Sequence, residues 1–117
     1  MKLPFLPAAI TLSLVSTAGL AAQQPTPALK EDKPGLAAQA TITPDSATHL
    51  ARLRVPRGRV VAREIEEEDG RLIYSFDMKV PGKSGIDEVN VDAKTAAIVG
   101  VEHESPRAEA RERKATR

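Results

Sequence analysis

The sequence predicts a small α+β domain at residues 41–104, in which one N-terminal helix packs on a four-stranded antiparallel sheet. A short helix signal comes first, and four segments with a strand-like pattern follow it, joined by short turns. Antiparallel sheets tolerate one polar face, so a single helix is enough to cover the other. The chain of 117 residues has room for one such domain and not for two.

The helix is expected to begin at Pro44 and to be stopped by Val55-Pro56 and Gly58. Thr43 is a favourable N-cap, Pro44 suits the first helical position, and Asp45 complements the helix dipole in the first turn. The apolar positions that share one helix face are Ala47, Leu50 and Ala51. Pro56 prevents the helix from continuing. A helix this short is marginal on its own, so it must pack against the sheet.

The strands are expected at residues 59–67, 71–80, 86–92 and 97–103. In the second strand the apolar residues alternate with mostly polar ones, and the apolar set is Leu72, Tyr74, Phe76 and Met78. Asp69-Gly70 predicts a tight hairpin turn, because this pair tolerates positive φ. Residues 81–85 are expected to form a flexible loop. The last turn places Ala96 where glycine is usual, and we expect a left-handed conformation there.

Three segments flank this domain. Residues 1–22 have the pattern of a secretory signal peptide, with Lys2 before an apolar stretch and small residues that permit cleavage after Ala21 or Ala22. An uncleaved membrane anchor is the alternative, although the stretch is short for a span of about 20 apolar residues. Residues 23–40 are expected to be a disordered linker. Residues 105–117 lack an apolar stripe and are expected to be a charged, disordered tail.

The composition limits the compartment and the partners. The chain has no cysteine, so an exported form would fold without disulfides. Removal of Lys2 with the leader leaves sixteen basic against sixteen acidic residues, and aromatic residues are scarce. Neither property favours nucleic-acid binding. We therefore expect a periplasmic or secreted protein that binds no nucleic acid and has no transmembrane segment in its mature chain.

Three stretches in this order resemble the PepSY domain family. They are ITPDSA at the start of the helix, VPRGRVVAREIEEEDGRLIYSFDM through the first hairpin, and EVNVDAKTAAIVGVE through the last. The similarity covers about residues 42–102. PepSY domains occur in the propeptides of thermolysin-like peptidases and in many short exported bacterial proteins. The family pattern has Gly where this chain has Ala96, and an apolar or small residue near Arg63.

The resemblance implies a helix packed on an antiparallel sheet and a non-catalytic role in protein contact or regulation. Inhibition of peptidases or regulation in the cell envelope has been proposed for the family, so we expect another envelope protein, such as a peptidase, as the partner. The oligomeric state is left open. The matching family positions are Gly70, Tyr74, Asp92 and Thr95, which we interpret as structural. Tyr74 would be a core aromatic, and Asp92 and Thr95 would bond turn amides.

No set of residues predicts catalysis, a cofactor site or a metal centre. Nucleophilic catalysis needs an activated side chain beside a base, but cysteine is absent, and His49 and His103 stand in no such context. His103 lies between Glu102 and Glu104, but neighbours on a strand point to opposite faces. We therefore expect no enzyme and no bound metal. The alternative is a small envelope protein that binds metal ions through surface carboxylates.

Basic and acidic residues segregate along the first expected strand. The predicted contact surface consists of Arg59, Arg63, Glu64, Glu66 and Glu68. The three glutamates share one strand face, so their charges repel unless solvent or cations relieve them. A solvated face is the simpler interpretation, and a patch for a basic partner or Ca²⁺ is the functional one. An exposed sheet edge can pair with an extended peptide and would complete the contact region.

Overall fold

A computed structural model describes Pro4 and residues 25–116 of the chain. Its elements are β1 (Leu29–Glu31), the 3-10 helix η1 (Ala37–Gln39), α1 (Pro44–Arg54), β2 (Arg59–Glu68), β3 (Arg71–Lys79), β4 (Ile86–Asp92), β5 (Ile98–Glu104) and α2 (Pro106–Ala115). The expected signal peptide lies outside the described residues, apart from Pro4. None of the helices in the described part of the chain has the length and apolar character needed to span a bilayer.

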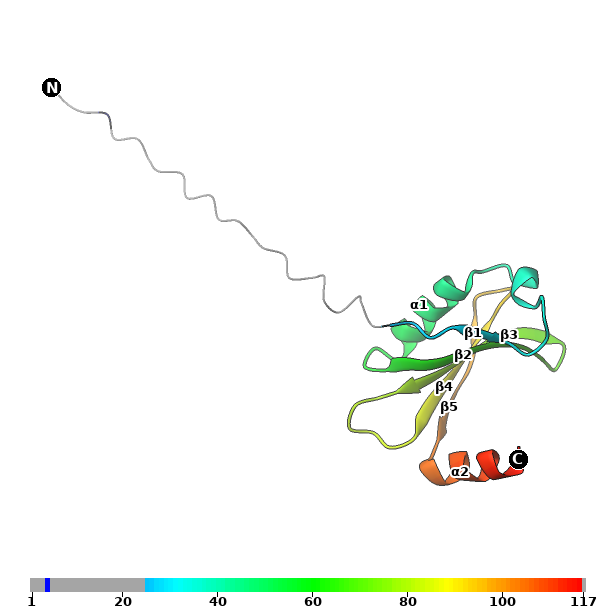
Figure 1. Ribbon diagram of the computed structural model, residues 1–117. Helices are drawn as coiled ribbons and strands as arrows, with labels where there is room; N and C mark the ends of the chain where they lie inside the picture. Colours follow the sequence, from blue (N-terminus) through cyan, green and yellow to red (C-terminus); the bar gives the residue numbers. More distant parts are fainter. Residues whose placement is uncertain (1–3, 5–24, 117) are drawn as a thin grey trace.

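The sheet has five strands of mixed direction, in the order β1-β2-β3-β4-β5. Strands β2 to β5 form the antiparallel meander that the sequence predicts. The prediction of only four antiparallel strands is wrong, because β1 adds to β2 in parallel, with Leu29 beside Arg63. α1 covers one face of this sheet, and α2 lies beyond the end of β5 (Figure 1).

The segment before α1 is folded, so the prediction of a disordered linker at residues 23–40 is wrong for residues 25–40. Besides β1 and η1, this segment places Leu36 in the core, where it is 3% exposed. The Glu31 carboxylate accepts hydrogen bonds from the backbone N–H groups of Gly35 and Ala37, both at 3.0 Å. These bonds close a compact turn between the strand and the buried leucine. We call residues 26–36 the strap.

The C-terminal segment is also more ordered than the sequence predicts. Residues 106–115 form α2, so the expectation of a disordered tail is wrong over that range. Ser105 is the N-cap, and its side chain accepts a hydrogen bond from the Ala108 backbone N–H at 3.3 Å. The side chains that the structure describes in α2 are exposed, as expected for a helix without an apolar stripe.

α1 begins as the sequence predicts and packs over β2, β3 and β4. The Thr43 hydroxyl accepts a hydrogen bond from the Ser46 backbone N–H at 3.1 Å, which satisfies one otherwise unpaired N–H group of the first turn. Ala47 and Ala51 are fully buried, and their small side chains let the helix lie close to the sheet.

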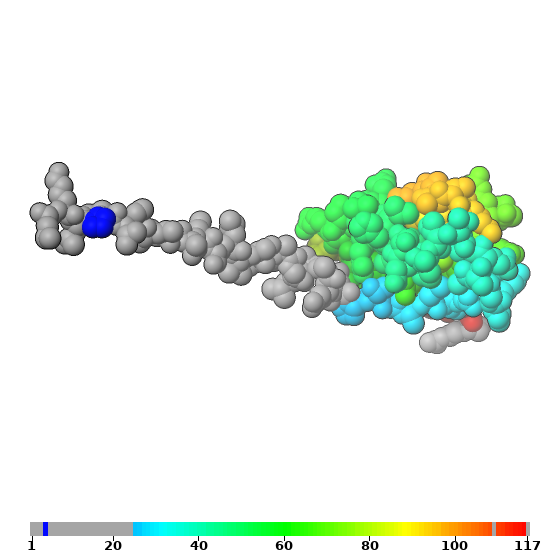
Figure 2. Space-filling model, turned by 90° about the horizontal axis from the view of Figure 1, so that it is seen from above, coloured from blue at the N-terminus to red at the C-terminus, as the bar shows by residue number. Residues whose placement is uncertain are grey.

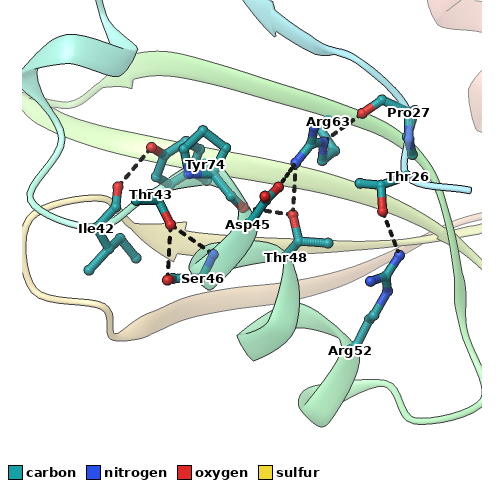
Figure 3. Close-up of polar contacts among 11 residues, drawn as sticks. Thr26, Pro27, Ile42, Thr43, Asp45, Ser46, Thr48, Arg52, Arg63 and Tyr74 are labelled. Atoms are coloured by element: carbon teal, nitrogen blue, oxygen red, sulfur yellow. Dashed lines mark hydrogen bonds and ion pairs between the residues drawn. The ribbon is translucent and has the colours of Figure 1, made fainter. Parts of the chain in front are cut away.

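Tyr74 lies at the centre of the core. Its side chain is fully buried together with Phe76, and its hydroxyl donates a hydrogen bond to the Ile42 carbonyl at 2.9 Å (Figure 3). This bond satisfies the buried hydroxyl, which would otherwise destabilise the core. Tyr74 thereby ties the middle of the sheet to Ile42, two residues before the start of α1.

The two tight turns use left-handed backbone. Asp69 and Gly70 join β2 to β3 with φ of 49° and 74°, as expected of an Asp-Gly hairpin. Ala96 has φ of 66°, which confirms the left-handed conformation predicted for it. The Asp92 carboxylate accepts from the backbone N–H groups of Lys94 at 2.8 Å and Thr95 at 3.0 Å, so it holds the turn that leads to Ala96.

Replacing Ala96 by glycine is expected to stabilise the domain by up to about 1 kcal/mol. Glycine relieves a left-handed strain of about 1–2 kcal/mol, but it also raises the entropy of the unfolded chain. Urea denaturation of the variant beside the parent chain measures the difference. A lower denaturation midpoint for Ala96→Gly would contradict this account of the turn.

Candidate contact surfaces on the two sheet faces and the open edge

The predicted contact residues of β2 divide between the two faces of the sheet. A bulge at Val61 shifts the register, and beyond it Arg63 stands opposite Phe76 while Glu64 stands opposite Ser75. Phe76 is buried under α1, so Arg63 points to the helix side. The sequence-based grouping of Arg63 with the glutamates is therefore wrong. Arg59, paired with Lys79 at the start of β2, is exposed.

Arg63 is buried between the strap and α1. Its side chain is only 10% exposed, and its Nε donates a hydrogen bond of 2.7 Å to the Pro27 carbonyl. Nη1 donates to the Thr48 hydroxyl and to the Asp45 carboxylate, both at 3.2 Å (Figure 3). One side chain therefore joins three segments of the chain. This role explains an arginine at a position where the family pattern has an apolar or small residue.

The other sheet face is acidic, and we call it the acidic face. Its carboxylates come from four strands and are Glu64, Glu66, Glu68, Asp77, Glu88 and Glu102. Partial burial raises the pKa of Glu66, and the charges of Glu64, Glu68 and Glu88 raise it further. The negative charge of Glu88 on β4 therefore acts on Glu66 of β2, so glutamates on separate strands repel one another across the acidic face.

The structure also brings together three residues that the sequence did not connect. Asp87 is buried, and its carboxylate lies 2.7 Å from His103 Nδ1 and 3.0 Å from Lys83 Nζ. Burial alone would raise the pKa of Asp87, but the hydrogen bonds from His103 and Lys83 hold it below its usual value. The cluster joins the loop before β4 to β5, so its position indicates a structural contact.

Acid is expected to destabilise the domain below about pH 4. The backbone N–H groups of Lys94 and Thr95 lower the pKa of Asp92, so its contribution is present above the unfolded pKa and is lost as the pH falls through the folded one. Asp92→Asn keeps the acceptor oxygen and removes the titration. Thermal melting should show the variant less stable than the parent at pH 7, and the difference should shrink as the pH falls below about 4. A difference that stays constant over this range would contradict this assignment.

The two edges of the sheet differ. At one edge, β1 covers β2, and the backbone N–H of Asp32 continues the contact with a 3.0 Å bond to the Ile65 carbonyl. At the other edge, no strand of the described chain pairs with the outer side of β5. We call the outer side of residues 98–102 the open edge. Apolar side chains are partly exposed along it, namely Ile98 (38%), Val99 (41%) and Val101 (39%).

The exposure of these side chains follows from the placement of α1. Val101 stands opposite the buried Val89 and Ile98 opposite the buried Val91, so both point to the helix side. The helix packs mainly over β2, β3 and β4 and leaves the β5 side chains partly uncovered. In Figure 2, residues of the last hairpin, in orange, and the strap, in blue and cyan, lie on opposite sides of the helix.

The described residues hold no group of three or more His, Asp or Glu side chains placed to bind a metal ion. His49 is on α1 and His103 is on β5, where it contacts Asp87. The metal-binding alternative therefore has no ligand set within residues 25–116.

A family model described as PepSY, "Peptidase propeptide and YPEB domain", matches residues 41–102. This range runs from just before α1 into β5 and covers more than half of the chain. The chain belongs to the PepSY family. None of the curated proteins and none of the solved structures compared with the chain gives a significant match.

Membership confirms the family that the sequence motifs indicated and gives the domain a general role. PepSY domains are generally non-catalytic propeptide or regulatory modules. The matched range includes Gly70 and Tyr74 of the first hairpin and Asp92 and Thr95 of the last. The strap lies before the matched range, so this PepSY domain carries one strand from outside it.

Proposed function

We propose that this PepSY domain is an exported, non-catalytic regulatory module that acts by protein contact in the cell envelope and modulates or inhibits a peptidase. Family membership supports a regulatory role and relates it to peptidases. The leader pattern of residues 1–22 supports export.

The open edge is the observation that carries the proposal. Unpaired strand edges are templates for pairing with another chain, and natural proteins usually protect them with charges, bulges or covering segments. This chain covers β2 with β1. Strand β5 has a bulge at Val99 and a charge at Glu102, but it still leaves three partly exposed apolar side chains. Strand addition supplies main-chain hydrogen bonds to an extended segment, so a peptidase would be bound at this edge through an extended segment of its own chain.

Affinity capture from envelope extracts and a panel of purified peptidases test this function. We expect the chain to capture an envelope protein or to slow at least one peptidase. Val101→Lys should weaken that effect because a charge on an edge strand opposes pairing. Val61→Lys is the matched control, since Val61 is also 39% exposed but lies on β2. If neither capture nor inhibition is detected, the proposed function is wrong.

A further inference from the structure

The strap shows which side-chain pattern suits a strand added to this sheet. In β1, Leu29 packs against the core on the helix side, and the next residue, Lys30, turns to the acidic face. Lys30 Nζ lies 4.0 Å from the Glu64 carboxylate, with which it is in register. In this added strand, the apolar residue therefore contacts the helix side of the sheet, and the basic residue that follows it lies on the acidic face.

The open edge offers the same two chemistries. On the helix side, Val101 and Ile98 present partly exposed apolar surface. On the acidic face, Glu102 stands directly opposite Glu88, and like charges at such a pair repel. Neither glutamate takes part in the ion pairs found among residues 25–116. A cation placed beside them by a new strand would relieve this repulsion.

A hollow along the acidic face reaches the same edge. It has a volume of about 410 Å³ and is lined by residues of β2 to β5 and of the first hairpin turn, including Glu68, Arg71, Asn90, Val99 and Glu102. The Asn90 side-chain oxygen is buried in this region without a hydrogen-bond partner among the described residues. A Lys or Arg side chain from an added strand would supply a donor as well as a positive charge.

We propose that the open edge binds an extended segment of a partner protein in which apolar side chains alternate with Lys or Arg. The apolar side chains lie over Val101 and Ile98 beside α1, and the basic ones lie over Glu102 and Glu88 on the acidic face. The inference rests on the proposed function, because it names the chemistry of the partner segment at the same edge. It distinguishes this partner from a second copy of the chain, whose β5 would add Glu102 to an already acidic face.

Fluorescence anisotropy with the purified chain tests the pattern. The probe is a labelled peptide of about eight residues in which Val and Lys alternate. The controls are the same peptide with Glu in place of Lys, and a peptide of equal composition with Val and Lys in separate blocks. We expect the alternating Val-Lys peptide to bind about tenfold more tightly than either control, a difference that a few charge pairs can supply.

Substitutions at Val101 and Glu102, with Val61 as the control position, locate the binding on the chain. Val101→Lys should abolish binding of the Val-Lys peptide, whereas Val61→Lys, at a site of equal exposure on β2, should leave it unchanged. Val101→Thr keeps the shape and β-branching of valine, so it tests the apolar contact if the lysine variant does not fold. Glu102→Lys should reduce or reverse the preference for Lys over Glu in the peptide.

Equal binding of the Lys and Glu peptides, or binding that survives both Val101 substitutions, would overturn the inference. So would sedimentation of the chain as a dimer that Val101→Lys dissociates, since the edge would then be closed by a second copy. Peptidase inhibition that persists without any peptide preference would reject this partner chemistry and leave the proposed function standing.

Discussion

Replacing Arg63 by alanine is expected to lower the free energy of unfolding by about 2–3 kcal/mol. The change removes a guanidinium that is only 10% exposed and that donates to the Pro27 carbonyl and to the Thr48 hydroxyl. Hydrogen bonds from a charged donor contribute more than neutral ones, and the packing of the arginine stem is also lost. Urea denaturation measures the loss.

The loss should be concentrated in the strap. Lys30 is the trypsin site within it, because Pro34 blocks cleavage after Lys33, so limited proteolysis should cut the Arg63→Ala chain after Lys30 faster than the parent chain. Asp45→Asn is the matched control, because the Asp45 side chain is 91% exposed and its ion pair with Arg63 should contribute little. Equal rates of cleavage in the parent and Arg63→Ala chains would show that Arg63 does not hold the strap.

Replacing Gly85 by alanine is expected to cost about 3 kcal/mol or more, by the sum of two effects. Gly85 has φ of 80°, a conformation that costs other residues about 1–2 kcal/mol. A Cβ there would also overlap the Glu104 carbonyl oxygen of β5 and lie 3.2 Å from His103 Cε1. Backbone cannot yield as a flexible side chain can, so the start of β4 and the end of β5 would have to separate.

Gly82→Ala separates the two effects. Gly82 has φ of 78°, but a Cβ there would meet nothing within 4 Å. It should therefore lose only the conformational part, about 1–2 kcal/mol. Chemical denaturation of both variants gives the comparison, and equal losses would show that the contact with β5 is not what requires glycine.

The helix and the meander could be predicted because each residue pattern agrees with its neighbours. Thr43 and Pro44 mark the start of α1, and the alternation around Tyr74 has the period of a strand with one buried face. The left-handed turn at Ala96 followed from its place in the last hairpin. These signals depend only on residues close together in the sequence, and the structure confirms the helix, the strand and the turn that they predict.

The strap could not be predicted from periodicity. Leu29 and Leu36 are its two apolar anchors, and two apolar residues seven positions apart are too few to establish a strand or helix period. The order of this segment comes from contacts distant in sequence, above all the bond between Arg63 and Pro27. The one local signal was Arg63 itself, a charged residue on a strand whose neighbour Ile65 faces the core.

The cluster at Asp87 depends on a single extra residue in β5. The register shifts between Asn90 and Val91, so one residue of β5, Val99, has no partner in β4. Beyond this bulge Asp87 stands opposite His103. Without it, Asp87 would face Glu102, and His103 would point to the other face of the sheet. A bulge leaves little trace in a single sequence, so the cluster could not be predicted.

The strap also limits how many partner strands the sheet can accept. A sheet with two bare edges could accept a strand on each side, and successive copies could then add head to tail without closing, as in a filament. The edge opposite β5 is formed by β1, which has only three residues, and very short edge strands oppose pairing. If β5 pairs with a partner as proposed, we therefore expect a one-to-one complex.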